Sequence, residues 1–112
     1  MDKGKIGKEQ EEIAVKFLKD KGYRIIHRNY VCKIGEIDII AEHKGFVVFV
    51  EVKYRKSDYF GMPREAVNYY KQQKIKRVAT FYLKWNRSLN TKCRFDVVEI
   101  LGDKIEHIEN CF

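Results

Sequence analysis

The chain has 112 residues, of which 45% are hydrophobic, and it carries a formal net charge of +7 at pH 7. This length and composition support one hydrophobic core, so they predict a single domain over residues 1–112 and exclude a disordered tail. No apolar run approaches the roughly 18 residues that cross a bilayer, and the first residues lack the apolar core of a secretion signal, so we expect a cytoplasmic protein with no membrane partner.

The first predicted element is an amphipathic helix over residues 6–21, which Gly22 would end. Ala14 and Leu18 lie on its apolar stripe, and Glu11 lies at the edge of that stripe. Because Glu11 precedes Ala14 by three residues, it lies on the side of the helix that can lean toward a sheet. Glu11 is therefore either a solvent-exposed charge, like its acidic neighbours, or an acid directed at a site on the sheet.

Three predicted strands follow the helix. Residues 23–32 are rich in Tyr, Ile and Val, which favours a first strand. The apolar runs 36–42 and 46–54 flank a short connection and predict a β-hairpin, with Lys44 and Gly45 as its turn residues. In the second run a Glu-Val-Lys tripeptide places an acid and a base on an otherwise apolar face of the strand.

The register of this hairpin decides which charged side chains meet. Pairing residue 43 with residue 46 and counting outward places Asp38 opposite Glu51 and Glu36 opposite Lys53. Like charges directly opposed across strands destabilise a sheet unless something neutralises them. A divalent cation would do so.

Two carboxylates beside a lysine suit metal-assisted hydrolysis of a phosphodiester. Carboxylate oxygens hold Mg²⁺, the bound ion polarises phosphoryl oxygens and activates water, and an ammonium group stabilises developing negative charge. Asp38, Glu51 and Lys53 could fill these roles. The alternative is a solvated hairpin face with an incidental Glu-Lys pair, since a short motif is only a hypothesis until its structural context supports it.

Positive charge is concentrated in residues 53–77, which hold eight basic and two acidic side chains, a net charge of +6. Basic side chains beside the proposed site favour a polyanionic partner, because lysine and arginine contacts to phosphates release counterions. The alternative is the ordinary basic surface of a soluble protein. The candidates for nucleic-acid contact are Arg55, Lys56, Arg64, Lys71 and Lys74.

The next predicted element is a long helix over residues 63–85. One face is apolar toward its end and polar toward its start, where Lys71 lies. We expect the second half to pack on the sheet and the first half to overhang a cleft that contains the paired acids. Lys71 and Gln72 would then reach a substrate phosphate or order the attacking water. The alternative is that this end of the helix is simply exposed.

Residues 93–101 and 104–108 predict two further strands. The predicted order is αβββαββ, which gives an α/β domain with a mixed sheet and a helical crossover to the fourth strand. Neither of the last two strands carries a candidate site. The three cysteines and three histidines lack the spacing of a disulfide framework or a zinc site, and no Gly-rich phosphate loop is present.

The hairpin carries a family resemblance. Its runs Gly-Glu-Ile-Asp-Ile-Ile-Ala over residues 35–41 and Val-Phe-Val-Glu-Val-Lys over residues 48–53 resemble the paired signature of the PD-(D/E)xK nuclease superfamily. More closely, the chain resembles the YraN-like family of bacterial proteins, which is similar to archaeal Holliday-junction resolvases. The resemblance extends over most of the chain and includes Glu11, Ala14, Gly22, Tyr23, Arg28, Asn29, Phe60, Gly61, Lys71 and Gln72.

The resemblance implies a restriction-endonuclease-like αβββαβ core with a mixed sheet, here with an extra C-terminal strand. It implies that Asp38 and Glu51 bind Mg²⁺ or Mn²⁺, with the Val52 carbonyl and Glu11 as further ligands. Lys53 would position or activate the water, with Gln72 as an auxiliary catalytic residue. Glu36 is a supporting candidate.

The leading hypothesis is a metal-dependent DNA endonuclease that acts on branched or otherwise structured DNA. The main alternative is a nucleic-acid-binding or DNA-processing accessory protein that has the fold and does not cut, because fold does not establish activity. A third class is a protein-interaction scaffold with no affinity for DNA. A two-fold homodimer would match a symmetric substrate, although no segment of the sequence marks an interface.

Overall fold

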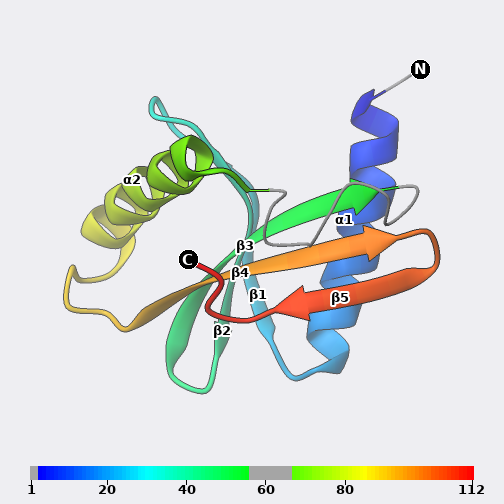
Figure 1. Ribbon diagram of the computed structural model, residues 1–112. Coiled ribbons are helices and arrows are strands. Elements are labelled where there is room, and N and C mark those ends of the chain that lie inside the picture. Colours follow the sequence, from blue (N-terminus) through cyan, green and yellow to red (C-terminus); the bar gives the residue numbers. More distant parts are fainter. Residues whose placement is uncertain (1–2, 56–66) are drawn as a thin grey trace.

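The computed structural model describes residues 3–55 and 67–112, and the side chains of residues 3–6 are left out of the description. Figure 1 shows the elements within these ranges, which follow the predicted order αβββαββ. They are the helices α1 (Lys3–Asp20) and α2 (Tyr69–Asn86) and the strands β1 (Arg24–Val31), β2 (Glu36–His43), β3 (Phe46–Arg55), β4 (Cys93–Leu101) and β5 (Lys104–Ile108).

The strands form one five-stranded sheet in the order β1-β2-β3-β4-β5. Strands β3 and β4 are parallel and the other neighbouring pairs are antiparallel. A parallel pair needs a crossover, and the chain between β3 and β4 supplies it through α2. The mixed sheet and the helical crossover predicted from the sequence are therefore confirmed.

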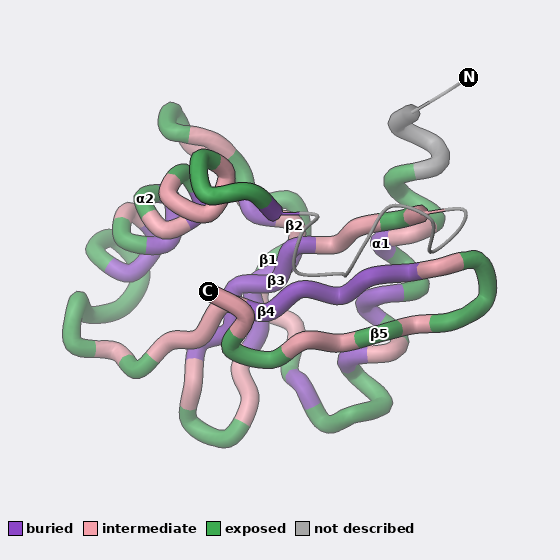
Figure 2. Tube along the Cα trace, viewed as in Figure 1, coloured by how far each residue is buried: buried purple, intermediate pink, exposed green. Residues whose placement is uncertain are grey.

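The sheet is covered on both faces, so the domain has three layers (Figure 1). Odd-numbered residues of β3, such as Val47 and Phe49, pack with the apolar side of α2. Even-numbered residues, such as Val48 and Val50, pack with α1. Figure 2 shows that the centres of β3 and β4 are the most continuously buried part of the sheet, as expected for strands packed on both faces.

Helix α1 ends where the sequence predicts. Gly22 has a positive φ of 91°, its N–H donates to the carbonyl of Lys19, and the N–H of Tyr23 donates to the carbonyl of Leu18. This pair of bonds is the Schellman motif, which glycine favours because it has no Cβ. Neither helix in the described ranges is long and apolar enough to cross a membrane.

The start of α2 corrects the sequence prediction. The helix was predicted over residues 63–85; residues 63–66 of that range lie outside the described residues. Residues 67 and 68 are not helical, because α2 begins at Tyr69 with Asn68 as its N-cap. The Asn68 backbone is extended, with ψ of 170°, and its side-chain oxygen accepts a hydrogen bond from the Lys71 N–H at 2.8 Å. An asparagine that satisfies an otherwise unpaired N–H stabilises a helix start. Lys71 therefore lies in the first turn of α2.

Candidate functional site

The β2–β3 hairpin has the predicted turn and register. Lys44 and Gly45 both have positive φ values, 51° and 84°, as a two-residue type I′ turn requires. His43 pairs with Phe46, and the ladder continues to the pair of Ile39 with Val50.

Beyond the pair of Ile39 with Val50 the backbones of β2 and β3 no longer pair, and a side chain of β2 contacts β3 instead. The ladder ends one step before Asp38 would face Glu51, and it does not reach Glu36 and Lys53, so their predicted pairing does not form. Instead, an Asp38 carboxylate oxygen accepts a hydrogen bond from the Val52 N–H at 2.8 Å. At this position the β2 backbone no longer pairs with β3. The Asp38 carboxylate therefore accepts the hydrogen bond that a backbone carbonyl of β2 would accept in a continued ladder.

This arrangement brings the carboxyl groups of Asp38 and Glu51 together. The pKa of Asp38 is raised from 3.8 to about 7 by burial, by the negative charge of Glu51 and by a hydrogen bond between the two carboxyl groups. The Val52 N–H and the Lys71 ammonium oppose part of that rise. Asp38 therefore holds a proton more tightly than an ordinary aspartate does, as expected for two acids in one partly desolvated place.

Two lysines supply the positive charge at this pair. Glu51 is only 7% exposed, and its Oε1 lies 2.8 Å from Lys71 Nζ and 3.9 Å from Lys53 Nζ. The pKa of Lys53 is lowered by burial and by the neighbouring ammonium of Lys71. Burial alone would lower the pKa of Lys71 too, but its contacts with Glu51 and Lys53 and the charge of Asp38 together outweigh burial and raise it. The two ammonium groups thus differ in how readily they release a proton.

The sequence places these groups by simple periodicity. Glu51 continues the odd-numbered face of β3 that carries Val47 and Phe49, so it points to the α2 side of the sheet. Lys71 lies one helical turn before Ile75, which packs on that same face. The apolar contact between α2 and the sheet therefore ends at a charged cluster, here called the acidic pair (Asp38 and Glu51) with its two lysines (Lys53 and Lys71).

The donor set of the acidic pair fits Mg²⁺ or Mn²⁺ better than a structural metal. Within residues 3–55 and 67–112, no cluster of three or more His, Cys, Asp or Glu side chains could hold a metal ion. Magnesium is usually bound through one or two carboxylates, with waters and substrate phosphates completing its shell. Two convergent carboxylates whose mutual repulsion raises the pKa of Asp38 provide that kind of donor set.

Two predicted auxiliary residues have other contacts. Glu11, on α1, is 7% exposed and accepts hydrogen bonds from Arg28 Nε at 3.2 Å and Asn29 Nδ2 at 3.0 Å. The side-chain amide of Gln72 donates to the carbonyl of Val67 at 2.8 Å and so supports the start of α2. Neither contact joins these side chains to the acidic pair.

The predicted nucleic-acid contacts are placed unequally. Arg55 binds the buried Glu99 through Nε at 3.0 Å and Nη2 at 2.7 Å, so its guanidinium lies in an internal ion pair. Lys56 and Arg64 lie outside the described residues. Lys71 and Lys74 line a groove of about 360 Å³ between the start of α2 and the connection from β1 to β2.

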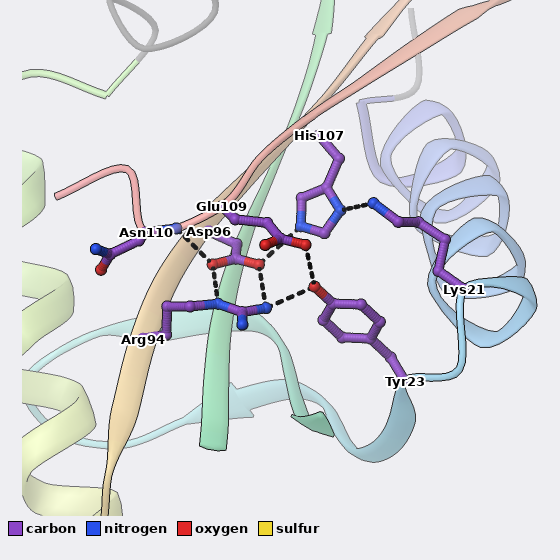
Figure 3. Close-up of polar contacts among 7 residues, drawn as sticks. All are labelled: Lys21, Tyr23, Arg94, Asp96, His107, Glu109 and Asn110. Carbon is purple, nitrogen blue, oxygen red and sulfur yellow. Dashed lines mark hydrogen bonds and ion pairs between the residues drawn. The ribbon is translucent and has the colours of Figure 1, made fainter. Parts of the chain in front are cut away.

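A second polar cluster, shown in Figure 3, was not predicted from the sequence. Asp96, which is fully buried, accepts hydrogen bonds from Arg94 Nε at 3.0 Å and the Asn110 N–H at 3.0 Å, and lies 2.7 Å from His107 Nε2. Burial alone would raise the pKa of Asp96, but the bonds with His107 and Arg94 lower it. Arg94 lies in the same strand as Asp96, but His107 and Asn110 reach Asp96 only through the pairing of β5 with β4, which no spacing in the sequence indicates.

The same cluster connects the end of the chain to α1. Lys21 Nζ lies 2.7 Å from His107 Nδ1, and the Tyr23 hydroxyl donates to Glu109 at 3.0 Å. The pKa of Tyr23 is raised by burial and by the charge of Asp96. Asp96 lies on the α1 side of β4, on the opposite face of the sheet from the acidic pair. We therefore assign this cluster to the packing of α1, β4 and β5 and not to the candidate site.

Comparison with known proteins identifies the family. Residues 10–100 match the model of "Uncharacterised protein family UPF0102". A UPF0102 protein of Thermodesulfovibrio yellowstonii is 49% identical over 107 residues, which cover 96% of this chain and 95% of that protein. A UPF0102 protein of Caldanaerobacter subterraneus is 43% identical over an alignment of 119 residues that covers 100% of this chain and 98% of that protein. The chain therefore belongs to the UPF0102 family, the YraN-like family that its motifs resemble.

Proposed function

We propose that this protein is a metal-dependent DNA endonuclease that hydrolyses phosphodiester bonds, with the acidic pair as its metal site. The observation that carries the proposal is the meeting of Asp38 and Glu51 at the point where β2 leaves β3, with Lys53 and Lys71 beside them. Paired carboxylates with adjacent ammonium groups are the residue types that phosphodiester hydrolysis needs.

The metal would be held by the carboxylates of Asp38 and Glu51, with the Val52 carbonyl as a further donor. A bound Mg²⁺ or Mn²⁺ ion supplies Lewis-acid polarisation of the phosphate and a more acidic water. The elevated pKa of Asp38 means that its proton must leave before both carboxylates can act as ligands. Metal affinity should therefore increase as pH rises through about 7.

The two lysines have separate roles in this proposal. Lys71, whose pKa is raised, stays protonated and neutralises Glu51 or an incoming phosphate oxygen. Lys53, whose pKa is lowered by burial and by Lys71, is the better of the two lysines to orient water and exchange a proton with it. Lys71 is thus assigned to binding and Lys53 to the chemical step.

DNA is the proposed substrate because of where the positive charge lies. Lys53 and Lys71 lie at the acidic pair and Lys74 lines the groove beside it. These lysines belong to a segment of the sequence, residues 53–77, with a net charge of +6, and electrostatic attraction of this kind favours a polyanion. Branched or structured DNA is proposed from the resemblance to junction resolvases, and a homodimer would present two sites to its two arms.

A plasmid-nicking and junction-cleavage assay with and without Mg²⁺ tests the proposal. We expect cleavage that requires the metal, is abolished by Lys53→Ala and Asp38→Ala, and is retained by Lys104→Ala, an exposed lysine in β5. DNA binding that is sensitive to salt but unchanged by Asp38→Ala, with no cleavage by the unmodified protein, would instead support a binding module. Absence of both binding and cleavage at low salt would leave the scaffold class.

A further inference from the structure

The groove beside the acidic pair has chemistry that the proposed cleavage reaction does not use. Its α2 wall is formed by Lys71, Lys74 and Ile75, and its other wall comes from the end of β1 and the start of β2, including Val31 and Glu36. In Figure 1 the connection between β1 and β2 lies beside the start of α2. Because Lys71 also contacts Glu51, the groove leads directly to the candidate site.

Lys74 is positioned across the groove by close packing. A Cβ atom on Gly35 would lie 3.0 Å from Lys74 Cε and 3.4 Å from Val78 Cγ2. Because Gly35 has no side chain, the aliphatic part of Lys74 can pack against the connection between β1 and β2. Lys74 is exposed, so an external anion can reach it, and it forms no ion pair with any residue in the ranges 3–55 and 67–112.

An exposed tyrosine lies near this groove, one helical turn before Lys74. Tyr69 and Tyr70 are 74% and 70% exposed in the first turn of α2. At 100° per residue, Tyr70 lies about 40° from Lys74 around the helix, whereas Tyr69 lies about 140° away, on the opposite flank. Tyr70 lies about 100° from Lys71, so it borders the Lys74 side of the groove, whereas Tyr69 lies farther from both lysines.

These features match a single strand better than a duplex. A volume of about 360 Å³ is at the small end of ligand pockets and can admit one nucleotide. Val31 and Ile75 offer apolar contact to a base, and the carboxylate of Glu36 can accept from an exocyclic amino group. An exposed ring can stack only on a base that is unpaired and accessible.

We propose that this groove and Tyr70 bind single-stranded nucleic acid and direct it to the acidic pair, an inference that rests on the proposed nuclease function. Lys74 and Lys71 contact successive phosphates, and Tyr70 stacks on a base next to them. The preferred substrates are then single strands and the flaps or splayed ends of branched DNA. Fully paired duplex and fully paired junctions are poorer substrates.

Fluorescence anisotropy in EDTA tests the binding separately from cleavage. The probes are a labelled 20-nucleotide single strand and the blunt duplex of the same sequence. The unmodified protein should bind the single strand more tightly than the duplex. Tyr70→Ala should weaken binding of the single strand about five- to hundredfold, since one stacked base contributes about that much to affinity. Its affinity for the duplex should change less than twofold.

Tyr69→Ala is the matched control, because it removes an equally exposed tyrosine from the other flank of the same helical turn. It should change both affinities less than twofold. Lys74→Gln should reduce the salt dependence of single-strand binding by about 0.7 in the log–log slope, the value for one phosphate contact. Equal losses in the two tyrosine variants, or tighter binding of the blunt duplex, would overturn the inference.

Cleavage of the same probes in Mg²⁺ separates the two proposals. If single-strand binding depends on Tyr70 but no probe is cut, the nuclease proposal fails and the groove inference stands. If blunt duplex and single strand are cut equally well and Tyr70→Ala has no effect on either, the inference fails and the nuclease proposal stands. Thermal unfolding of each variant should match that of the unmodified protein, because both tyrosines are solvent-exposed.

Discussion

Replacing Asp38 with asparagine should make the stability of the protein less dependent on pH. In the folded chain the pKa of Asp38 is raised from 3.8 to about 7 by burial, by Glu51 and by their shared hydrogen bond. Between these two values the folded state binds a proton that the unfolded state has released. Stability must therefore fall as pH rises from about 4 to about 7, and then level off.

The size of the effect follows from the shift. One pKa unit corresponds to 1.36 kcal/mol, so a rise from 3.8 to about 7 corresponds to a loss of about 4 kcal/mol at most. Asparagine carries no charge, and its side-chain oxygen can still accept the Val52 hydrogen bond. We therefore expect Asp38→Asn to gain about 4 kcal/mol in free energy of unfolding relative to the unmodified protein between pH 4 and pH 8.

Urea denaturation in EDTA at several pH values measures this difference, and Asp103→Asn serves as the control because Asp103 is exposed in the β4–β5 turn. The Asp103 variant should run parallel to the unmodified protein. A difference between Asp38→Asn and the unmodified protein that stays constant from pH 4 to pH 8 would refute the reasoning. It would mean that the carboxyl group is solvated or well separated from Glu51.

Three other predictions concern single contacts. Lys71→Gln should mainly raise KM and Lys53→Gln should mainly lower kcat in steady-state cleavage assays, because only Lys71 is assigned to binding; the opposite division would contradict these roles. Asn68→Ala should lower the free energy of unfolding by about 1 kcal/mol in urea titration, through loss of the N-cap bond to Lys71 N–H, and an unchanged value would argue against that cap. Arg55→Met should lower the free energy of unfolding by about 3–5 kcal/mol, because the substitution leaves the buried Glu99 without its guanidinium partner. A loss below about 1 kcal/mol would show that other groups stabilise the Glu99 carboxylate.

The hairpin was predictable because its determinants are local. The apolar runs mark β2 and β3, and Lys44 with Gly45 fixes the turn, so the register to Ile39 and Val50 follows. The end of the ladder was not predictable in this way. It depends on a side chain of β2 that captures a backbone N–H of β3, a bond between Asp38 and Val52 that the two-residue period does not indicate.

The assignment of basic residues shows the same limit. Arg55 belongs to the charged segment by sequence, but its partner Glu99 lies 44 positions away on the parallel neighbour β4. Asn68 is one polar residue in a helical pattern, and only its extended backbone reveals it as the cap of α2. The density of charge in a segment can indicate the class of molecule that the segment binds. The contact that each side chain makes depends on which residues the fold brings beside it.

A crystal structure of the protein grown with Mn²⁺ tests the central claim most directly, because anomalous scattering locates the ion without assumptions. The account predicts one Mn²⁺ ion bound by carboxylate oxygens of both Asp38 and Glu51, with Lys71 Nζ displaced from its 2.8 Å contact with Glu51. A structure at saturating Mn²⁺ in which the ion binds elsewhere, or in which only one of the two acids contacts it, would contradict the account.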